Sequence, residues 1–558
     1  MSRTTTRPRP AAPVRALARA ASVLSTGLAV ALLAACTGGA GATSPSDGGS
    51  PRAGGDLTVL ISNFDAGWVP SKSSISSYEG NVWGEITDKL VYVDPKGAVS
   101  PWIAESWDQS KDARTYTLHL KQGVTFSDGT PLDAQAVVTN IDTWAKGDPA
   151  RGITRIALFP SASYDHAKAV DDHTVEVVFT KPTLGFIPTL GYHGSILVSP
   201  KSIALSLDEQ GDLSKEIGSG PFVVTSWKAG DSVVLAKRPD YDWGPKVLDH
   251  DGPAYLDTVT YKIVKEDSLR SSAVQSGQAD VAFNVSPQEI ETLRGQGFDV
   301  ETPRYLGFVH GFKVSTKAAP FDDLRVRQAL QHGIDRQQII DTVYTSDWQA
   351  ATGFIQGTVP EAGDFSSTFA YDPEQSKKLL DEAGWVAGAD GVRVKDGKAL
   401  ELTLYPTPYI ITSEPIDELV SQQLTKLGFK VTIQRLDVPS YLDRLTGNQS
   451  IALADVTRSF VDVGTVAGVL TDSNGGEDWF AVGHSDATLD RLSADISDAS
   501  DAASRKKLVD ELQEYVLDQG YFVPVTQIVQ RIYLQSPKVH GASFNGLAYA
   551  NYATAWVD

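Results

Sequence analysis

Side chains that could do chemistry are few and scattered in this sequence of 558 residues. None of the nine histidines stands three or four residues from another, so no single helix face offers the spacing of a zinc or nickel site. The sequence has no G-x-S-x-G, H-E-x-x-H, P-loop or G-x-G-x-x-G pattern. The glycines of "GSGPF" (218–222) lack the following Lys-Ser/Thr pair of a phosphate loop, so we predict a tight turn there. We therefore expect a protein that binds rather than catalyses, with no catalytic residue, no metal site and no cofactor.

The single cysteine, Cys36, stands at the end of an export-type leader. Five arginines and no acidic residue precede it, and an Ala/Leu/Val-rich run covers about 20–35. That run is shorter than the roughly 20 apolar residues that a membrane-spanning helix needs. A basic start, a short apolar run and small residues before a cleavage point are typical of a secretory signal peptide. We predict that residues 1–35 are such a signal peptide.

The residues around Cys36 also predict a lipid anchor. Leu33-Ala34-Ala35-Cys36 resembles the bacterial lipobox, in which the cysteine is acylated and becomes the mature N-terminus. The alternative is an ordinary signal peptide with an incidental cysteine just beyond it. Residues 36–55 are rich in Gly, Ser, Thr, Ala and Pro, which predicts a flexible tether of roughly 25 Å. We expect a protein attached to the outer face of the plasma membrane, in a bacterium that the Ala-rich, Lys-poor leader suggests is Gram-positive.

The charge excludes one large class of partners. The formal net charge is −20, and it becomes −25 once the five arginines of the leader are removed. Such an acidic protein repels nucleic acid, so we expect no nucleic-acid partner. A hydrophobic content of 41% is ample for folded cores, and no later segment reaches 18 uninterrupted apolar residues.

The elements that would position a binding site alternate between strands and helices. "RTYTLHL" places Tyr116, Leu118 and Leu120 on one face of a predicted strand. "TPLDAQAVVTNIDTW" predicts a helix with Thr130 as its cap, Asp133 completing a capping box, and Val137, Ile141 and Trp144 on the buried face. Further helices are expected over 372–383, capped by Asp372 and stopped by Gly384, and over 416–427, followed at once by the strand "FKVTIQ". This pattern predicts an α/β fold.

Several of these segments together resemble a known family. "ITDKLVYVDPKGAVSPWIAESWDQSKDARTYTLHLKQGVTFSDGTPLDAQAVV" (86–138) is similar to the signature region of the extracellular solute-binding proteins of family 5, which serve ABC importers of peptides, nickel complexes and some other solutes. The segments that follow it in the same order are "GSGPFVVTSW", "KRPDYDWG", "SGQADVAF", "PFDDLRVRQALQHGIDRQQII", "YDPEQSKKLLDEAGW" and "VPV…VHG". The resemblance runs from about Asp56 to the C-terminus.

The resemblance implies a two-lobed, periplasmic-binding-protein-like (Venus flytrap) fold with an extra subdomain on the first lobe. Applied to this chain, lobe I would comprise 56–92, 215–312 and 526–558, with an inserted subdomain over 93–214. Lobe II would comprise 313–525, and the crossings near Lys313 and Val525 would form the hinge. Ligand held between the lobes would stabilise a closed form that a permease reads.

The resemblance also suggests ligand-binding residues. In peptide-binding relatives an acid in a "W-x-x-D-Y-x-D-P" segment pairs with the peptide α-amine, and Asp462 in "RSFVDVGTV" matches it. This chain lacks the tryptophan, has Val463 in place of the aromatic residue and offers Asp455 as a rival, so Asp462 could equally be a structural residue. Arg458 is a candidate for a ligand carboxylate. The aromatic candidates for the cleft wall, any of which could instead lie in the core, are Phe64, Trp68, Tyr405, Phe460 and Trp479.

We therefore predict a monomeric, membrane-anchored receptor, not an enzyme. It would bind a peptide or peptide-like solute and deliver it to the permease subunits of an ABC importer. The alternatives are a receptor for a metal chelate, siderophore-like compound or glycoside, a secreted hydrolase, and a chaperone or adhesin. A hydrolase would need a nucleophile–base pair or a metal site formed by residues distant in the sequence.

Overall fold

The structure is a computed structural model, in which strands and helices alternate along the chain. It describes residues 50–64, 66–71, 78–156, 158–317, 319–408, 410–437, 440–441, 443–444, 453–464, 467 and 486–558. Ser50–Asp558 forms a single unit. Within the described residues, no helix combines the length and the apolar character that crossing a bilayer requires.

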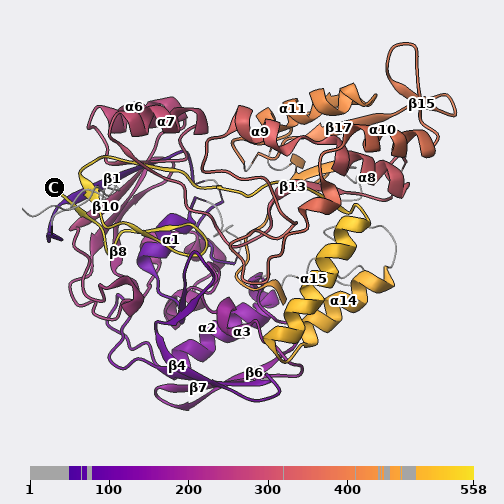
Figure 1. The fold of residues 1–558 in the computed structure, drawn as a ribbon. Helices are drawn as coiled ribbons and strands as arrows, with labels where there is room; N and C mark the ends of the chain where they lie inside the picture. The colour runs from indigo at the N-terminus through magenta and orange to yellow at the C-terminus, as the bar shows by residue number, and fades with distance from the viewer. Residues whose placement is uncertain are drawn as a thin grey trace, which may run out of the picture. The chain divides into compact units, whose positions relative to one another are not determined.

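A seven-stranded sheet gathers strands from three distant parts of the sequence. Its order is β12-β21-β11-β1-β10-β9-β8. The bounds are β1 (Asp56–Ile61), β8 (Phe222–Lys228), β9 (Ser232–Lys237), β10 (Thr258–Ile263), β11 (Val281–Phe283), β12 (Asp299–Glu301) and β21 (Tyr533–Gln535). β1 lies parallel to both β10 and β11, and its Leu57, Val59 and Ile61 are buried in the core. α6 (Asp267–Gln275) and α7 (Ile290–Gly295) occur in the connections of this sheet (Figure 1).

A four-stranded antiparallel sheet follows the first strand in the chain. Its order is β4-β5-β7-β6, from β4 (Ala104–Gln109), β5 (Thr115–Leu120), β6 (Tyr164–Asp171) and β7 (Thr174–Phe179). The alternation predicted for β5 is confirmed, because Tyr116, Leu118 and Leu120 are all buried. Figure 1 shows α2 (Ala134–Lys146) lying beside this sheet, where it contacts β6 and β7.

The start of α2 differs from the prediction. The N-cap is Asp133, whose carboxylate accepts a hydrogen bond from the Ala136 amide at 2.8 Å. Thr130 is therefore not the cap, because Pro131 forms a bridge with Thr125 before the helix begins. The predicted buried face of α2 is confirmed by Val137, Ile141 and Trp144, which lie in the core.

A five-stranded sheet occupies the second half of the chain. Its order is β18-β17-β19-β13-β20, from β13 (His310–Val314), β17 (Glu401–Tyr405), β18 (Lys430–Ile433), β19 (Leu453–Val456) and β20 (Phe522–Thr526). α8 (Leu324–Gly333), α9 (Arg336–Val343), α10 (Pro373–Glu382) and α11 (Ser413–Lys426) accompany it. α10 starts at the predicted cap, since Asp372 accepts from the amides of Glu374 and Gln375. The predicted helix–strand unit is also confirmed: α11 ends before Gly428, and β18 follows and pairs in parallel with β17.

Two connections join the two larger sheets, at positions slightly displaced from the prediction. Lys313 lies inside β13 and Val525 lies inside β20, and these strands pair with each other. The crossings are instead the segments 302–309, between β12 and β13, and 527–532, between β20 and β21. Both segments lie within a few residues of the predicted crossings near Lys313 and Val525, and their role as a hinge stays a prediction.

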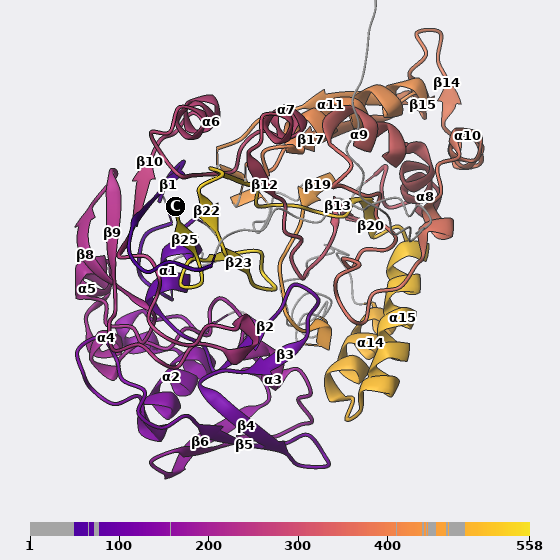
Figure 2. The ribbon, with the colours of Figure 1, turned by 60° about the vertical axis from the view of Figure 1, so that its left-hand side comes forward.

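A pair of helices precedes β20 in the chain. α14 (Ala487–Asp498) and α15 (Ala502–Asp518) lie side by side in Figures 1 and 2. Leu492 and Leu512 of this pair belong to the same apolar core as Tyr116 and Phe186, which lie on and near the four-stranded sheet. Side chains more than 300 residues apart thus share one core. The shorter elements are α1 (Gly80–Ile86), β2 (Val91–Val93), β3 (Val99–Pro101), α3 (Phe186–Thr189), α4 (Pro200–Ala204), α5 (Leu207–Gln210), β14 (Val386–Ala387), β15 (Arg393–Lys395), β16 (Lys398–Ala399), β22 (Val539–His540), β23 (Ser543–Phe544), β24 (Ala550–Asn551) and β25 (Trp556–Val557).

Candidate functional site

Four separate segments of the chain meet around His193. This residue follows α3, is only 7% exposed, and packs against Tyr192 with the two rings tilted and their centroids 3.8 Å apart. Tyr549, from the C-terminal segment, faces it at 6.5 Å. Burial lowers the pKa of His193 well below its ordinary value, and the positive charges of Arg531, Lys89 and Arg458 lower it further. The imidazole is therefore neutral at physiological pH.

We call Lys89, Arg458 and Arg531 the basic cluster. Arg531 lies in the crossing between β20 and β21, is 3% exposed, and places its guanidinium 3.9 Å from the centroid of the Tyr549 ring. Arg458 follows β19, and its carbonyl accepts a hydrogen bond from the Phe308 amide at 2.8 Å. This bond ties Arg458 to the other crossing, so the two arginines are positioned by the two connections between the sheets.

Lys89 contributes the third cation from the segment after α1. α1 ends at Thr87, whose amide bonds back to the Trp83 carbonyl. Burial lowers the pKa of Lys89 to about 8, although Asp88 and Glu85 act in the opposite direction. Its ammonium lies 5.9 Å from the Trp102 ring centroid. A cation at this depth favours a compact anionic partner.

A small cavity opens beside Lys89. Its lining includes Tyr92, Trp102, Asn545 and Asn551, and its volume is about 30 Å³. The asparagine side chains can donate or accept hydrogen bonds, and the aromatic rings supply apolar contact. The combination of one ammonium, two amides and two aromatic rings suits a small polar group such as a carboxylate.

Asp462, the predicted partner of a ligand amine, is engaged by a side chain of the protein. It is 4% exposed, and its carboxylate accepts a hydrogen bond from Arg505 of α15 at 2.7 Å. The same guanidinium donates to Glu361 at 2.5 Å. Although burial lowers the pKa of Arg505, the charges of Asp462 and Glu361 raise it above its ordinary value. We call these three residues the acidic socket.

The aromatic candidates lie in several places. Phe460 is 1% exposed and packs edge-to-face on Phe308, with centroids 5.1 Å apart. Phe64 and Trp68 follow β1 and pack against each other, with tilted rings whose centroids are 5.0 Å apart. Tyr405 ends β17, and the Arg444 guanidinium lies 5.6 Å from its ring. Trp479 and Cys36 lie outside the described residues. The structure thus places Arg458 in the basic cluster and Asp462 in the acidic socket. Phe460 lies in the apolar core, where it contacts Phe308.

No pattern in the sequence predicted Lys89, His193, Arg531 or Tyr549 as site residues. The available signal was weak: His193 and Arg531 each lie next to apolar residues, in "GYHGSILV" and "VTQIVQRIYL". A polar or charged side chain in such a stretch is a candidate for burial, and buried charges usually have a partner or a function.

A Ser–His–Asp set of residues is buried in the five-stranded sheet region, but its geometry is not that of a hydrolase. His310 bonds to one oxygen of Asp455, and Ser413 donates its hydroxyl hydrogen to the other oxygen. All three are at most 1% exposed. In a catalytic triad the histidine lies between the serine and the acid, whereas here the acid lies between the other two. His310 therefore does not activate Ser413.

The described residues contain no group of three or more His, Cys, Asp or Glu side chains placed to hold a metal ion.

Comparisons with known proteins define the family. Residues 98–478 match the model of the bacterial extracellular solute-binding proteins, family 5. The glutathione-binding protein GsiB of Escherichia coli K12 is 27% identical over 425 residues, which cover 74% of this chain and 73% of GsiB.

Solved structures show the same fold. NikA of Brucella suis, in complex with Fe(III)-EDTA, is 22% identical with a TM-score of 0.78, covering 90% of this chain and 100% of NikA. The oligopeptide-binding protein AppA of Bacillus subtilis, in complex with a nonapeptide, is 22% identical with a TM-score of 0.74, covering 91% and 100% of the two chains. These are two-lobed proteins, which confirms the predicted fold class. With more than half of its length matching the family model, this chain belongs to the bacterial extracellular solute-binding proteins of family 5.

Proposed function

We propose that this protein is the receptor of an ABC importer for a peptide or peptide-like solute, and that the basic cluster binds a carboxylate of that solute. Members of the family bind small-molecule or peptide ligands and work with ABC transporters. The relatives named above include a glutathione-binding and an oligopeptide-binding protein. The single observation that carries the carboxylate assignment is the meeting of Lys89, Arg458 and Arg531 around a neutral His193.

The chemistry of the cluster fits this ligand class. Arginine presents a planar fork that matches a carboxylate, and lysine supplies a compact charge. A charge pair is several-fold stronger in a buried site than in water because the effective dielectric constant is lower. Tyr549 and Trp102 add apolar surface next to the cations.

The proposed lobes would close on such a ligand. We assign 56–92, 215–312 and 526–558 to lobe I, 93–214 to its inserted subdomain and 313–525 to lobe II. The grouping of strands into a seven-stranded and a five-stranded sheet supports this division into two lobes, although β13 and β20, which the assigned boundaries cross, both belong to the five-stranded sheet. Lys89 and Arg531 then belong to lobe I, His193 to the subdomain and Arg458 to lobe II. A ligand that contacts all of them favours the closed form, since only that form brings the residues together.

The test is calorimetric binding of glutathione and a panel of di- to pentapeptides to the mature protein, each as the free acid, the C-terminal amide and the N-acetylated form. We expect amidation to weaken binding about 10–100-fold, as loss of a charge-assisted hydrogen bond implies. N-acetylation should change the affinity less than about tenfold, because Arg505 already neutralises much of the acidic socket.

Two variants locate the effect. Arg458→Gln should remove most of the difference between free acid and amide. Arg435→Gln should not, because Arg435 is 62% exposed and pairs with Glu414. Equal binding of acid and amide by the unmodified protein would refute the carboxylate assignment. A large loss on N-acetylation alone would return the amine-binding role to Asp462.

The basic cluster would also suit an anionic metal chelate, which is the second candidate. Native mass spectrometry of the protein as purified separates the two ligands, since a chelate carries the isotope pattern of its metal. A co-purified chelate, with no peptide bound in the panel above, would favour this second ligand class.

We further propose that Cys36 carries the lipid anchor, which the lipobox-like residues before it support. Full-length Cys36→Ala should appear in the soluble extracytoplasmic fraction rather than with membranes. Retention of the variant on washed membranes would refute the anchor.

A further inference from the structure

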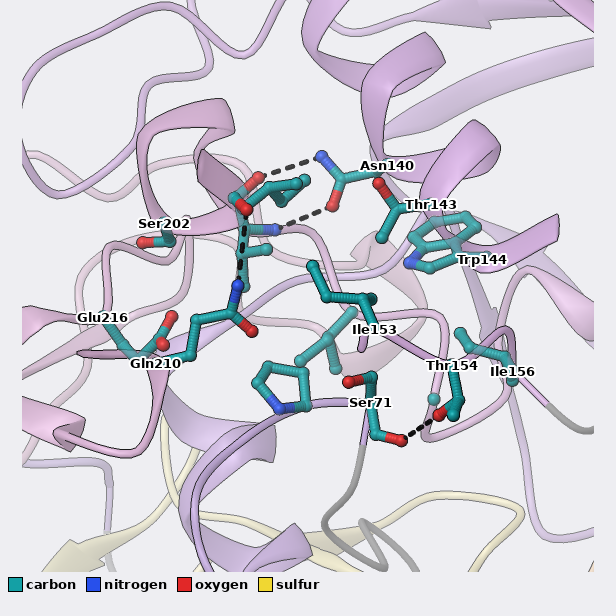
Figure 3. Close-up of a pocket in the computed structure, with 15 residues that line it drawn as sticks. Ser71, Asn140, Thr143, Trp144, Ile153, Thr154, Ile156, Ser202, Gln210 and Glu216 are labelled. Carbon is teal, nitrogen blue, oxygen red and sulfur yellow. Dashed lines mark hydrogen bonds between the residues drawn. The ribbon is translucent and has the colours of Figure 1, made fainter. Parts of the chain in front are cut away.

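A second cavity lies wholly within residues 70–216, apart from every residue of the basic cluster. Its volume is about 50 Å³. The residues that line it come from the loop after β1, from α2, α4 and α5, and from the segments between them: Pro70, Ser71, Asn140, Thr143, Trp144, Ile153, Thr154, Ile156, Gly194, Ile196, Val198, Ser202, Ile203, Gln210 and Glu216. The hydrogen bond from Thr154 to the Ser71 carbonyl, at 2.6 Å, ties the loop to the rest of the lining (Figure 3).

The cavity has a polar side and an apolar side. Figure 3 shows Glu216, Gln210 and Ser202 on one side, and Trp144 and Ile156 on the other. A ligand that fills this space would therefore carry one polar group and a short apolar body.

The carboxylate of Glu216 is the unusual group of this cavity. Both of its oxygens are shielded from water, and neither has a partner at ordinary hydrogen-bond distance; the Ser202 hydroxyl makes a longer, weaker interaction with them. Burial raises the pKa of Glu216 to about 8; the nearby Ser202 hydroxyl lowers it, and Asp212 raises it. Buried carboxylates normally have a partner, so this one has capacity for a ligand.

The other polar groups on this side are mainly acceptors. The Gln210 amide nitrogen already donates to the carbonyls of Leu205, at 3.0 Å, and Ile203, at 3.3 Å, which leaves the amide oxygen to accept. The side-chain amide nitrogen of Asn140 donates to the Val198 carbonyl, and its amide oxygen accepts from the Val198 amide. Acceptors beside a carboxylate are complementary to an ammonium group, which offers three donors and a positive charge.

We propose that this cavity binds a small primary alkylammonium ion, with its ammonium at Glu216 and its alkyl chain against Trp144. The inference is independent of the solute proposed for the basic cluster. The ligand arrives as the cation and the Glu216 carboxyl gives its proton to solvent, so an ammonium–carboxylate pair replaces a neutral acid. Below pH 8, each unit of rising pH should increase the apparent affinity up to tenfold; above pH 8 the affinity should level off.

The test uses n-propylammonium as the probe and the mature protein in calorimetry, in buffers of different ionisation enthalpy. At pH 7 we expect saturable binding with the release of close to one proton, and at pH 9 binding with almost none. The proton count is measured on the unmodified protein and needs no variant. Absence of saturable binding up to about 50 mM, a concentration well above what four heavy atoms in a good site require, would overturn the proposal, as would binding at pH 7 without proton release.

Two variants and one neutral probe complete the experiment. Glu216→Gln mimics the protonated side chain, so the fold should be retained, while propylammonium binding at pH 8 should fall at least tenfold. Asp208→Asn removes the same charge from an exposed position on α5 and should leave binding unchanged. n-Propanol, the neutral probe, should bind to Glu216→Gln and to the unmodified protein with the same affinity. Equal propylammonium binding by the Glu216→Gln variant would refute the site, and peptide binding at the basic cluster, measured in parallel, would be unaffected by that result.

Discussion

The acidic socket and the basic cluster differ in the charges that the fold brings together. In the socket, Arg505 donates to both Asp462 and Glu361, so the protein supplies the counter-charge itself. At the basic cluster, burial keeps the His193 imidazole neutral by lowering its pKa, and the positive charges of Arg531, Lys89 and Arg458 lower that pKa further. A region whose charges pair internally contributes to the fold. A region where three cations from distant segments converge is suited to an anion that arrives from solution.

The largest expected effect tests whether the socket is structural. Arg505→Ala would leave Asp462 and Glu361 close together without their cation, so the free energy of unfolding should fall by about 3–5 kcal/mol. Urea denaturation of the mature protein measures this. Arg491→Ala in α14 is the matched control, because Arg491 and its partner Asp495 are about half exposed, and the loss should stay within about 0.5 kcal/mol. A similar small loss for both variants would remove the distinction between the two regions.

The next largest effect concerns His193, the neutral histidine beside the basic cluster. The pKa of His193 is lowered in the folded protein, so its contribution to stability is present above about pH 6.5 and is lost as pH falls below that value. The unmodified protein should lose up to about 1.4 kcal/mol per pH unit there relative to His193→Gln. Thermal unfolding of both proteins from pH 7.5 to pH 5 measures the difference. If the unfolding temperatures of the two proteins fell in parallel as the pH was lowered, the pKa of His193 would not be lowered by folding, and the basic cluster would not act on this residue.

The smallest effect concerns an exposed ion pair between the segment after β7 and α14. Lys181, which follows β7, pairs with Asp498 of α14 at 3.6 Å, but the side chains are 62% and 47% exposed. Lys181→Ala should therefore change the free energy of unfolding by at most about 1 kcal/mol, and less at high salt. Denaturation at low and at 0.5 M salt, the latter roughly enough to screen exposed pairs, tests this. A loss comparable to that of Arg505→Ala would mean that exposed charges matter as much as the buried socket.

Most of the local structure could be predicted because it depends on neighbouring residues. Alternation in β5, the Asp372 cap of α10 and the α11–β18 unit were all predicted correctly. The cap of α2 was not, because Thr130 and Asp133 are both suitable caps and only the pairing of Pro131 with Thr125 excludes the first. The exact ends of β13 and β20 could not be predicted either, since these strands pair with each other across the chain.

The candidate site was predicted less well. Arg458 and Asp462 were named from the resemblance, but their surroundings depend on residues far away in the sequence. Arg505 stands 43 positions from Asp462, and the residues around His193 come from four segments spread between Lys89 and Tyr549. No local pattern connects them.

By itself, the sequence determined the type of several elements, and the resemblance of its segments to a known family implied the family and the two-lobed fold. Hydrophobic periodicity and helix caps act over a few residues, so they can be read directly from the chain. Only the tertiary structure decided that Arg505 meets Asp462 and Glu361, and that Lys89, Arg458 and Arg531 converge on His193. That outcome depends on the packing of segments hundreds of residues apart, where the cost of burying a charge is set by whatever side chain lies opposite.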